Sequence, residues 1–149
     1  MDKITVYCDG ACSGNQFDTN IGGWGAVLQY KDKVKKICGG ERNTTNNIME
    51  LTAAIKSLES IKTTNIPVEM YIDSAYVVNG MNEWIAGWIK KGWRKSNKKP
   101  VENKELWIQL NELRNKQTSV EFFKVKGHNG VELNELADAL ANKGMDQLR

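Results

Sequence analysis

The sequence contains few residues of several types that, when abundant, indicate a particular class of protein. It has two prolines, one histidine and three cysteines among 149 residues. The cysteines (Cys8, Cys12 and Cys38) are odd in number and lack the spacing of a zinc site. They therefore argue against a disulfide scaffold and favour a reduced, cytoplasmic compartment.

Long hydrophobic stretches are also missing. No apolar run approaches the roughly 18 residues of a membrane span, and residues 1–10 lack the basic and apolar regions of a signal peptide. A composition of 40% hydrophobic and 26% charged residues is typical of a globular protein away from membranes. The length predicts a single domain over residues 1–149.

Positive charge is concentrated in one segment. Residues 86–104 contain seven basic residues and one acidic residue, so this segment carries +6. The whole chain carries +3, which leaves −3 for the remainder. A basic patch on a mildly acidic body predicts a polyanionic partner.

Tryptophans alternate with lysines in this segment. Trp84 and Trp88 are four residues apart and share one helix face. Core packing is one interpretation of that pair, but the charges and the glycines at 87 and 92 argue against a wholly buried helix. We expect lysines to contact phosphates and tryptophan rings to contact sugars or bases, with recognition of shape or backbone in place of sequence. The side chains concerned are Trp84, Trp88, Trp93, Lys90, Lys91, Lys98 and Lys99.

The hydrophobic pattern predicts alternating strands and helices. Strands are expected at 4–9, 22–30, 35–40, 68–73 and 119–127, and helices at 49–61, 74–80, 84–93, 103–116 and 133–145. Residues 31–33 are expected to form the turn of a hairpin, and helix 84–93 is expected to be broken at Gly87 and Gly92. An antiparallel opening is thus followed by alternating α and β units. This order favours an α/β fold with a mixed sheet and helices packed on it.

Four acidic residues fall where they could converge. Asp9 and Asp73 end two expected strands, at the sheet edge where α/β proteins bind ligands, while Glu50 is expected in the first turn of helix 49–61 and Asp138 within the last helix. Neither Arg nor Lys lies within three residues of Asp9, Asp73 or Asp138. Clustered carboxylates need a cation, and Mg²⁺ prefers oxygen ligands. Metal-assisted phosphodiester hydrolysis is one interpretation; the other is that each acid is simply solvated.

His128 is the only histidine, in a glycine-flanked loop between a strand and a helix. Near a metal site such a side chain can move a proton, because it titrates near neutral pH. An inert surface histidine is the alternative.

Four stretches together resemble type 1 ribonuclease H in its bacterial form. They are YCDGACSGN (7–15), TTNNIMELTAAI (44–55), YIDSAYVVNG (71–80) and VKGHNGVELNELADALA (125–141). Residues 84–102 are similar to the basic protrusion of that family. The motifs occur in the family's order and spacing over nearly the whole chain.

The resemblance implies a ribonuclease H-like five-stranded mixed sheet in the order 3-2-1-4-5, with helices on both faces. It implies a monomeric endonuclease that cuts the RNA strand of RNA–DNA hybrids to 3′-hydroxyl and 5′-phosphate ends. Asp9, Glu50, Asp73 and Asp138 would hold two Mg²⁺ ions, with Mn²⁺ as a substitute, and His128 would assist proton transfer or product release.

The resemblance also implies residues that select the substrate. RNA is distinguished from DNA through its 2′-hydroxyl groups. The small residues of an expected turn over 10–15 would let the backbone approach the RNA, and side-chain amides can both donate and accept hydrogen bonds. Thr45 would seat a phosphate of the DNA strand. The other expected RNA contacts are Gly10, Cys12, Gly14, Asn15 and Asn47.

Three positions depart from the family pattern. Ala75 stands where Gln is frequent, Asn43 where Arg is frequent, and Glu132 where Pro is usual. We expect these changes to weaken the grip on substrate without removing the chemistry.

Three rival interpretations remain. An integrase-like or junction-resolving nuclease of the same fold fits less well, because the chain has no extra DNA-binding domain. A non-catalytic hybrid-binding module would not need clustered carboxylates. An excised reverse-transcriptase domain is the third, although Met1 directly before the first strand and Arg149 soon after the last helix favour a freestanding protein.

Overall fold

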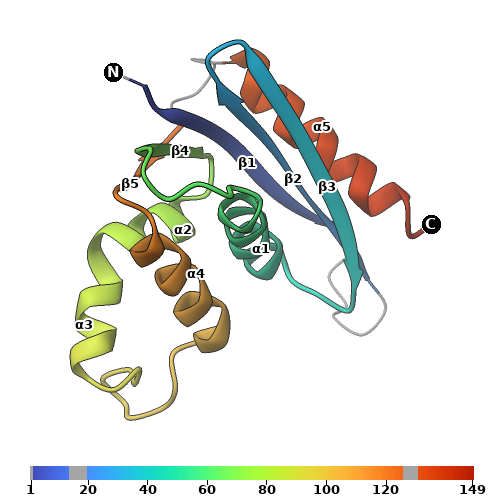
Figure 1. Ribbon diagram of the computed structural model, residues 1–149. Helices are drawn as coiled ribbons and strands as arrows, with labels where there is room; N and C mark the ends of the chain where they lie inside the picture. The colour runs from blue at the N-terminus through green and yellow to red at the C-terminus, as the bar shows by residue number, and fades with distance from the viewer. Residues whose placement is uncertain (1, 14–19, 126–130) are drawn as a thin grey trace.

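The computed structural model describes residues 2–13, 20–125 and 131–149, which form a five-stranded sheet with helices around it (Figure 1). The strands are β1 (Ile4–Ser13), β2 (Ile21–Tyr30), β3 (Lys33–Arg42), β4 (Val68–Ile72) and β5 (Val120–Lys124). The helical segments are α1 (Asn46–Glu59), α2 (Ala75–Asn79), the π-helical turn η1 (Gly80–Trp84), α3 (Ile85–Lys90), α4 (Lys104–Lys116) and α5 (Val131–Asp146). No helix in these described ranges has the length and apolarity to cross a membrane.

The sheet order is β3-β2-β1-β4-β5, which confirms the predicted order 3-2-1-4-5. β1, β2 and β3 pair antiparallel, and a tight turn after Tyr30 joins the last two. β4 pairs parallel with β1 and with β5. Parallel neighbours need long crossovers, and helices supply them.

Helices cover both faces of the sheet, as predicted. Figure 1 shows α1 on one side of the sheet and α5 on the other. Side chains of β1 alternate accordingly: Val6 and Cys8 are buried in the cluster that includes α1, whereas Tyr7 packs against the cluster that includes Ala137 and Leu140 of α5. β1 is therefore the central strand against which both helices are placed.

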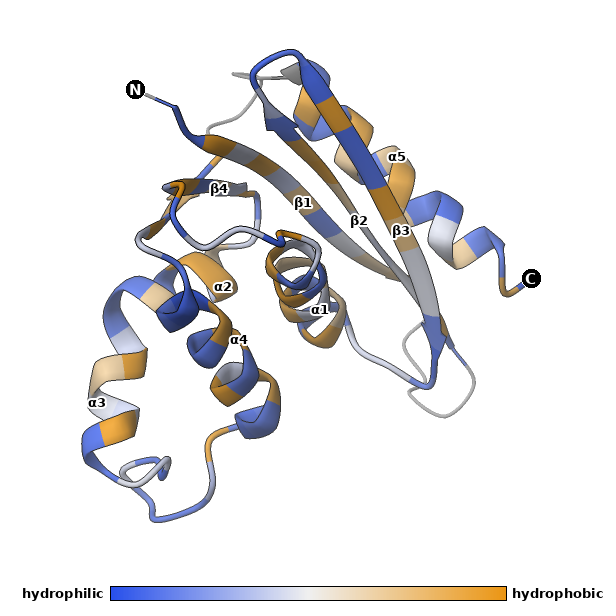
Figure 2. Cartoon of the chain, viewed as in Figure 1, coloured by the Kyte–Doolittle hydropathy of each residue, from blue (hydrophilic) through white to orange (hydrophobic). Residues whose placement is uncertain are grey.

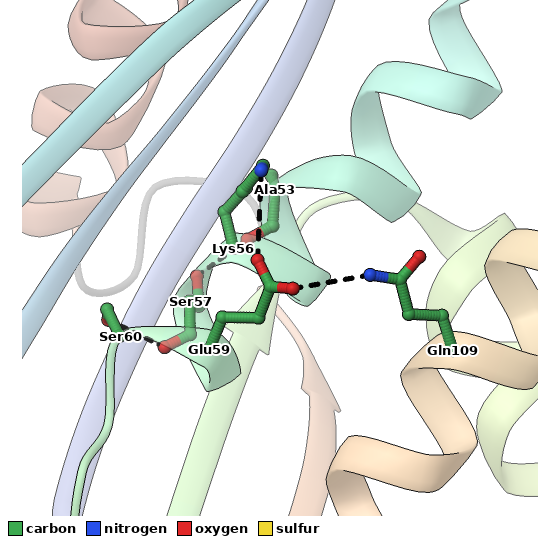
Figure 3. A network of polar contacts seen from close by, with 6 residues as sticks. All are labelled: Ala53, Lys56, Ser57, Glu59, Ser60 and Gln109. Carbon is green, nitrogen blue, oxygen red and sulfur yellow. Dashed lines mark hydrogen bonds and ion pairs between the residues drawn. The ribbon is translucent and has the colours of Figure 1, made fainter.

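Helix α1 is buried on nearly every side and not only along one stripe. It begins at Asn46, three residues earlier than expected, because the Thr45 side chain accepts a hydrogen bond from Ile48 N at 3.1 Å. From position 49 to position 58 only Lys56 is exposed. The sheet lies on one side and α4 on another, and Gln109 of α4 donates to Glu59 near the end of α1 (Figure 3).

Segment 75–90 is continuously helical, which corrects one prediction. A helix over 84–93 broken at Gly87 is wrong, because Gly87 lies inside α3. The chain reverses at Gly92, whose φ of +69° suits glycine. Figure 1 shows α3 and the following loop extending away from the sheet, and Figure 2 shows that loop to be mostly hydrophilic.

Candidate active site

Asp9 lies within β1 at the point where this strand loses one neighbour. The prediction that the strand ends at Asp9 is wrong, because β1 continues to Ser13 in register with β2. Its parallel pairing with β4 stops at Cys8 and Ile72. From Asp9 onward β1 is thus paired with β2 alone, and residues 10–13 form an open strand edge instead of the expected turn.

Asp73 lies at the same edge on the neighbouring strand. It directly follows β4, and Cys8 is opposite Ile72, so Asp9 and Asp73 occupy equivalent next positions on parallel strands. The chain then turns into α2, which Ser74 caps by accepting a hydrogen bond from Val77 N at 3.3 Å. The register of β1 and β4 therefore places these two acids at the same edge of the sheet, as predicted.

Glu50 reaches this edge from α1. It lies in the second turn of the helix and not in the first, because α1 begins at Asn46. A glycine allows its approach: a side chain on Gly10 would put its Cβ 2.5 Å from Glu50 N. The Gly10 N–H donates to Glu50 Oε1 at 3.2 Å and to Asp9 Oδ1 at 2.9 Å. One backbone group thus links two of the acids.

Asp138 reaches Asp9 from the other face. Gly25 of β2 is directly opposite Asp9, and α5 lies so close to it that an added Cβ would be 2.5 Å from Leu140 Cβ and 2.8 Å from Ala137 O. Asp138 follows Ala137, and it lies near enough to Asp9 to raise the pKa of the Asp9 carboxyl. Glycines on two strands therefore let one helix from each face bring an acid to Asp9.

Burial and mutual repulsion disfavour the charged forms of the inner acids. Burial raises the pKa of Asp9 to about 7, and the neighbouring Asp138 adds to this effect. The pKa of Glu50 is raised to about 9, mainly by burial and next by the negative charge of Asp9. The Gly10 N–H opposes both shifts. Such a cluster retains protons until a cation joins it.

The donor atoms suit a hard cation. Glu50 Oε2 is buried without a hydrogen-bond partner, which is costly unless another group binds it. The cluster offers only carboxylate oxygens, the ligands that Mg²⁺ prefers. In the ranges that the structure describes, no three His, Cys, Asp or Glu side chains already surround a single ion position. Ion binding therefore requires side-chain adjustment, with water or phosphate completing the coordination.

One basic residue near these acids escaped the sequence prediction. Lys124, at the end of β5, is in register with Ile72, and its Nζ lies 3.8 Å from Asp73 Oδ1. Lys124 is far from the four acids in sequence, so the absence of Lys and Arg beside Asp9, Asp73 and Asp138 gives no sign of it. The proximity could have been predicted by pairing the expected strands 68–73 and 119–127 in parallel, because that pairing places Lys124 beside Asp73.

Sequence comparison identifies the family. The RNase H family model matches residues 1–146. The chain is 51% identical to "Ribonuclease H" of Ruthia magnifica subsp. Calyptogena magnifica over 148 residues, which cover 99% of each chain. It is 52% identical to "Ribonuclease HI" of Caulobacter vibrioides over 145 residues, 97% of this chain and 94% of the relative. The chain belongs to the ribonuclease H family. It is an enzyme of the nuclease class.

Solved structures of ribonucleases H share the architecture. LC9-RNase H1, a type 1 RNase H with the type 2 active-site motif, superposes with a TM-score of 0.86 at 33% identity, covering 99% of this chain and 74% of that one. LC11-RNase H1 in complex with RNA/DNA hybrid gives a TM-score of 0.71 at 23% identity, covering 98% and 99%. The second similarity shows the fold alone.

The expected RNA and DNA contacts of this ribonuclease H lie around the open edge of β1. Cys12 is on that edge and Asn47 is exposed in the first turn of α1. Thr45 is the N-cap of α1, so its side-chain oxygen is already engaged. Gly14, Asn15 and His128 lie outside the described residues.

The basic protrusion (residues 84–102) is held by aromatic packing. Trp107 of α4 is fully buried and contacts Trp88, with ring centroids 5.2 Å apart. Trp88 in turn lies 5.9 Å from Trp84 and 6.2 Å from Trp93. Trp88 and Trp93 therefore serve packing, whereas Trp84 is 40% exposed. Sequence reasoning missed Trp107, the buried centre of this cluster.

A groove on the protrusion combines an exposed ring with cations. It has a volume of about 310 Å³. Its lining residues are Trp84, Gly87, Trp88, Lys91, Arg94, Lys95 and Ser96. Lys90, Lys98 and Lys99 are exposed on the same protrusion but do not line this groove. Of the residues predicted to contact nucleic acid, Trp84, Trp88 and Lys91 thus share one groove.

The departures from the family pattern lie at the surface. Ala75 is the exposed first residue of α2, next to Asp73. Asn43 has a φ of +56°, a conformation that asparagine tolerates better than most residues. Glu132 is exposed in the first turn of α5. None of the three displaces an acid of the cluster.

Proposed function

We propose that this ribonuclease H hydrolyses the RNA strand of RNA–DNA hybrids at internal positions, leaving 3′-hydroxyl and 5′-phosphate ends. The observation that carries the proposal is the convergence of Asp9, Glu50 and Asp138 from three elements, beside Asp73. The raised pKa values of the Asp9 and Glu50 carboxyls support a site built to receive cations. The fold shared with a protein solved in complex with RNA/DNA hybrid supports the substrate class.

Ribonucleases H use divalent metal ions. Asp9, Glu50, Asp73 and Asp138 would hold two Mg²⁺ ions, with Mn²⁺ as a substitute. Bound ions supply an activated water and stabilisation of the leaving oxygen. Asp9 and Glu50 release protons when they bind metal, because burial raises the pKa of both. The buried, partnerless Glu50 Oε2 is the donor atom that this arrangement explains.

Strand choice would depend on the open edge of β1. Beyond Cys8 this edge has no β4 partner, so it would be open to ribose hydroxyls, although the Gly10 N–H already donates to Asp9 and Glu50. Gly10 and Cys12 lie on that edge, and Asn47 lies at the start of α1, whose residue 50 belongs to the acid cluster. The residues that contact RNA would then be close neighbours in sequence of two acids of the cluster, Asp9 on β1 and Glu50 on α1.

The direct test is incubation of a hybrid, labelled on either strand, with Mg²⁺ or with EDTA. Internal cuts confined to the RNA strand and abolished by EDTA would support the proposal. Cleavage of duplex DNA would instead favour another nuclease of the same fold.

The lysines of the protrusion are expected to bind phosphates. Changing Lys90, Lys91, Lys98 and Lys99 to Ala should raise KM about ten-fold and flatten its dependence on salt, because fewer counterions are released on binding. The measurement is KM for a hybrid between 50 and 200 mM salt, roughly the range over which such contacts weaken. Changing Lys31, Lys33, Lys35 and Lys36 to Ala is the matched control, since it removes equal charge from the β2–β3 hairpin. Equal salt slopes for both variants would contradict the role.

His128 is expected to assist proton transfer. His128→Ala should lower kcat about 100-fold, the usual scale of general acid–base catalysis, and leave Mg²⁺ affinity unchanged. Steady-state kinetics and calorimetric Mg²⁺ titration check the two parts. An unchanged kcat would discard this role.

We propose further that residues 1–149 act as one domain and as a monomer. The free thiols of Cys8, Cys12 and Cys38 support a reducing, cytoplasmic location.

A further inference from the structure

Lys124 is placed beside the acid cluster by the sheet and not by a loop. β5 pairs with β4 up to Ile72 and Lys124, and Val125 N continues the contact by donating to Ile72 O at 3.0 Å. The backbone position of Lys124 is therefore fixed one residue from Asp73. Among the ion pairs of the described residues, the contact of Lys124 Nζ with Asp73 Oδ1 is the one that involves an acid of the cluster.

The four acids are compensated differently in the absence of metal. Asp9 neighbours both Glu50 and Asp138, and the charge of Asp73 also acts on Glu50. Asp73 differs from the other three in having an ammonium group 3.8 Å away. The side chains of Lys124 and Asp73 are 50% and 61% exposed, so the pair is weak and its ammonium can move into solvent. A divalent cation on Asp73 would meet a like charge at this distance.

We propose that Lys124 is a charge-compensating residue of the metal site. Its ammonium group neutralises Asp73 in the metal-free protein and competes with one divalent ion for that carboxylate. Lys124 therefore raises the Mg²⁺ concentration that is needed for an ion to bind at Asp73. This inference rests on the proposed metal site.

The test is calorimetric titration of Mg²⁺ into the free protein, without nucleic acid. Lys124→Met should lower the Mg²⁺ Kd about two- to five-fold, the range that an exposed ion pair supports. Lys124→Arg keeps the charge and should retain the wild-type Kd. Lys36→Met is the matched control: it removes the same charge from β3, at the opposite edge of the sheet, where salt screens the effect. The Mg²⁺-induced rise in unfolding temperature gives a second readout.

Two results would overturn the inference. One is an unchanged or weaker Mg²⁺ affinity in Lys124→Met. The other is an equal gain in Lys36→Met, which would reduce the effect to net charge. Hydrolysis is measured separately: Mg²⁺ binding without RNA cleavage would contradict the proposed function and leave the Lys124 comparison valid. Failure of the wild-type protein to bind Mg²⁺ would overturn both.

Discussion

Asp9→Asn is expected to slow cleavage of the RNA strand by at least about a thousand-fold. Asp9 is the acid that contacts both helix-borne acids and adjoins Asp73 in the strand register. Replacing its carboxylate by an amide removes a ligand of the proposed metal site, and several kcal/mol of charge stabilisation correspond to three or more factors of ten in rate. Single-turnover cleavage of a labelled hybrid at saturating Mg²⁺ measures the loss. Cleavage at the wild-type rate would refute the assignment.

The same substitution should stabilise the metal-free protein at alkaline pH. The pKa of Asp9 is raised to about 7 in the folded protein, above its ordinary 3.8, so the folded state holds a proton that the unfolded state releases. Wild-type stability therefore falls as pH rises from about 4 to 7, and an amide has no such dependence. We expect Asp9→Asn to gain about 1–3 kcal/mol in unfolding free energy at pH 8 in EDTA, and little near pH 4.

Asp73→Asn is the matched control for this stability effect. Its side chain is exposed, so the carboxylate keeps most of its hydration in the folded protein. We expect Asp73→Asn to lose activity without a comparable gain in stability. Denaturant unfolding of both variants in EDTA at pH 8 separates the two cases. A gain of the same size in both would show that general charge reduction, and not burial of Asp9, is responsible.

Gly25→Ala is expected to lower kcat about 100-fold with little change in KM. The new methyl group would meet Leu140 Cβ and Ala137 O and push α5 away from the sheet. Asp138 then moves relative to Asp9, and a misplacement of about 1 Å can cost a hundred-fold in rate. Overpacking of this kind also lowers stability by about 1–3 kcal/mol. Kinetics on a hybrid, at a temperature where circular dichroism shows the variant folded, check the prediction.

Gly23→Ala is the control on the same strand and the same helix. A Cβ there would meet Ala141 O and lie 2.6 Å from Met145 N, farther along α5 from Asp138. We expect a similar loss of stability but no more than about a ten-fold loss of kcat. If the two variants lose activity equally, displacement of α5 as a whole and not the spacing of Asp138 from Asp9 explains the effect.

The order of the strands in the sheet was predictable from the sequence because its signals are strong, whereas the roles of the four acids stay predictions. Strand ends at 68–73 and the hairpin at 31–33 have clear hydrophobic and turn patterns, and the family motifs carry the topology. The end of β1 was not predictable. Small residues after Asp9 are typical of a turn, yet pairing with β2 holds residues 10–13 in a strand. Tertiary hydrogen bonding therefore outweighed local preference.

Contacts between elements distant in sequence were equally hidden. The proximity of Lys124 to Asp73 depends on the register of β4 and β5. The burial of Trp107 depends on how α4 packs against η1 and the protrusion, because an added Cβ on Gly80 would clash with the indole ring. The continuous helix through Gly87 shows the same limit, since packing of Trp84 and Trp88 on one face offsets the low helix propensity of glycine.

The unequal lengths of β1 and β4 have a consequence for motion. β1 has ten residues and β4 has five, so the acid cluster lies where the central strand extends beyond its neighbour. We expect amide hydrogens of this central strand to exchange slowly and those of the protrusion, whose residues are mostly exposed, to exchange faster. Such a difference would let the protrusion adapt to a bound hybrid without loosening the acid cluster.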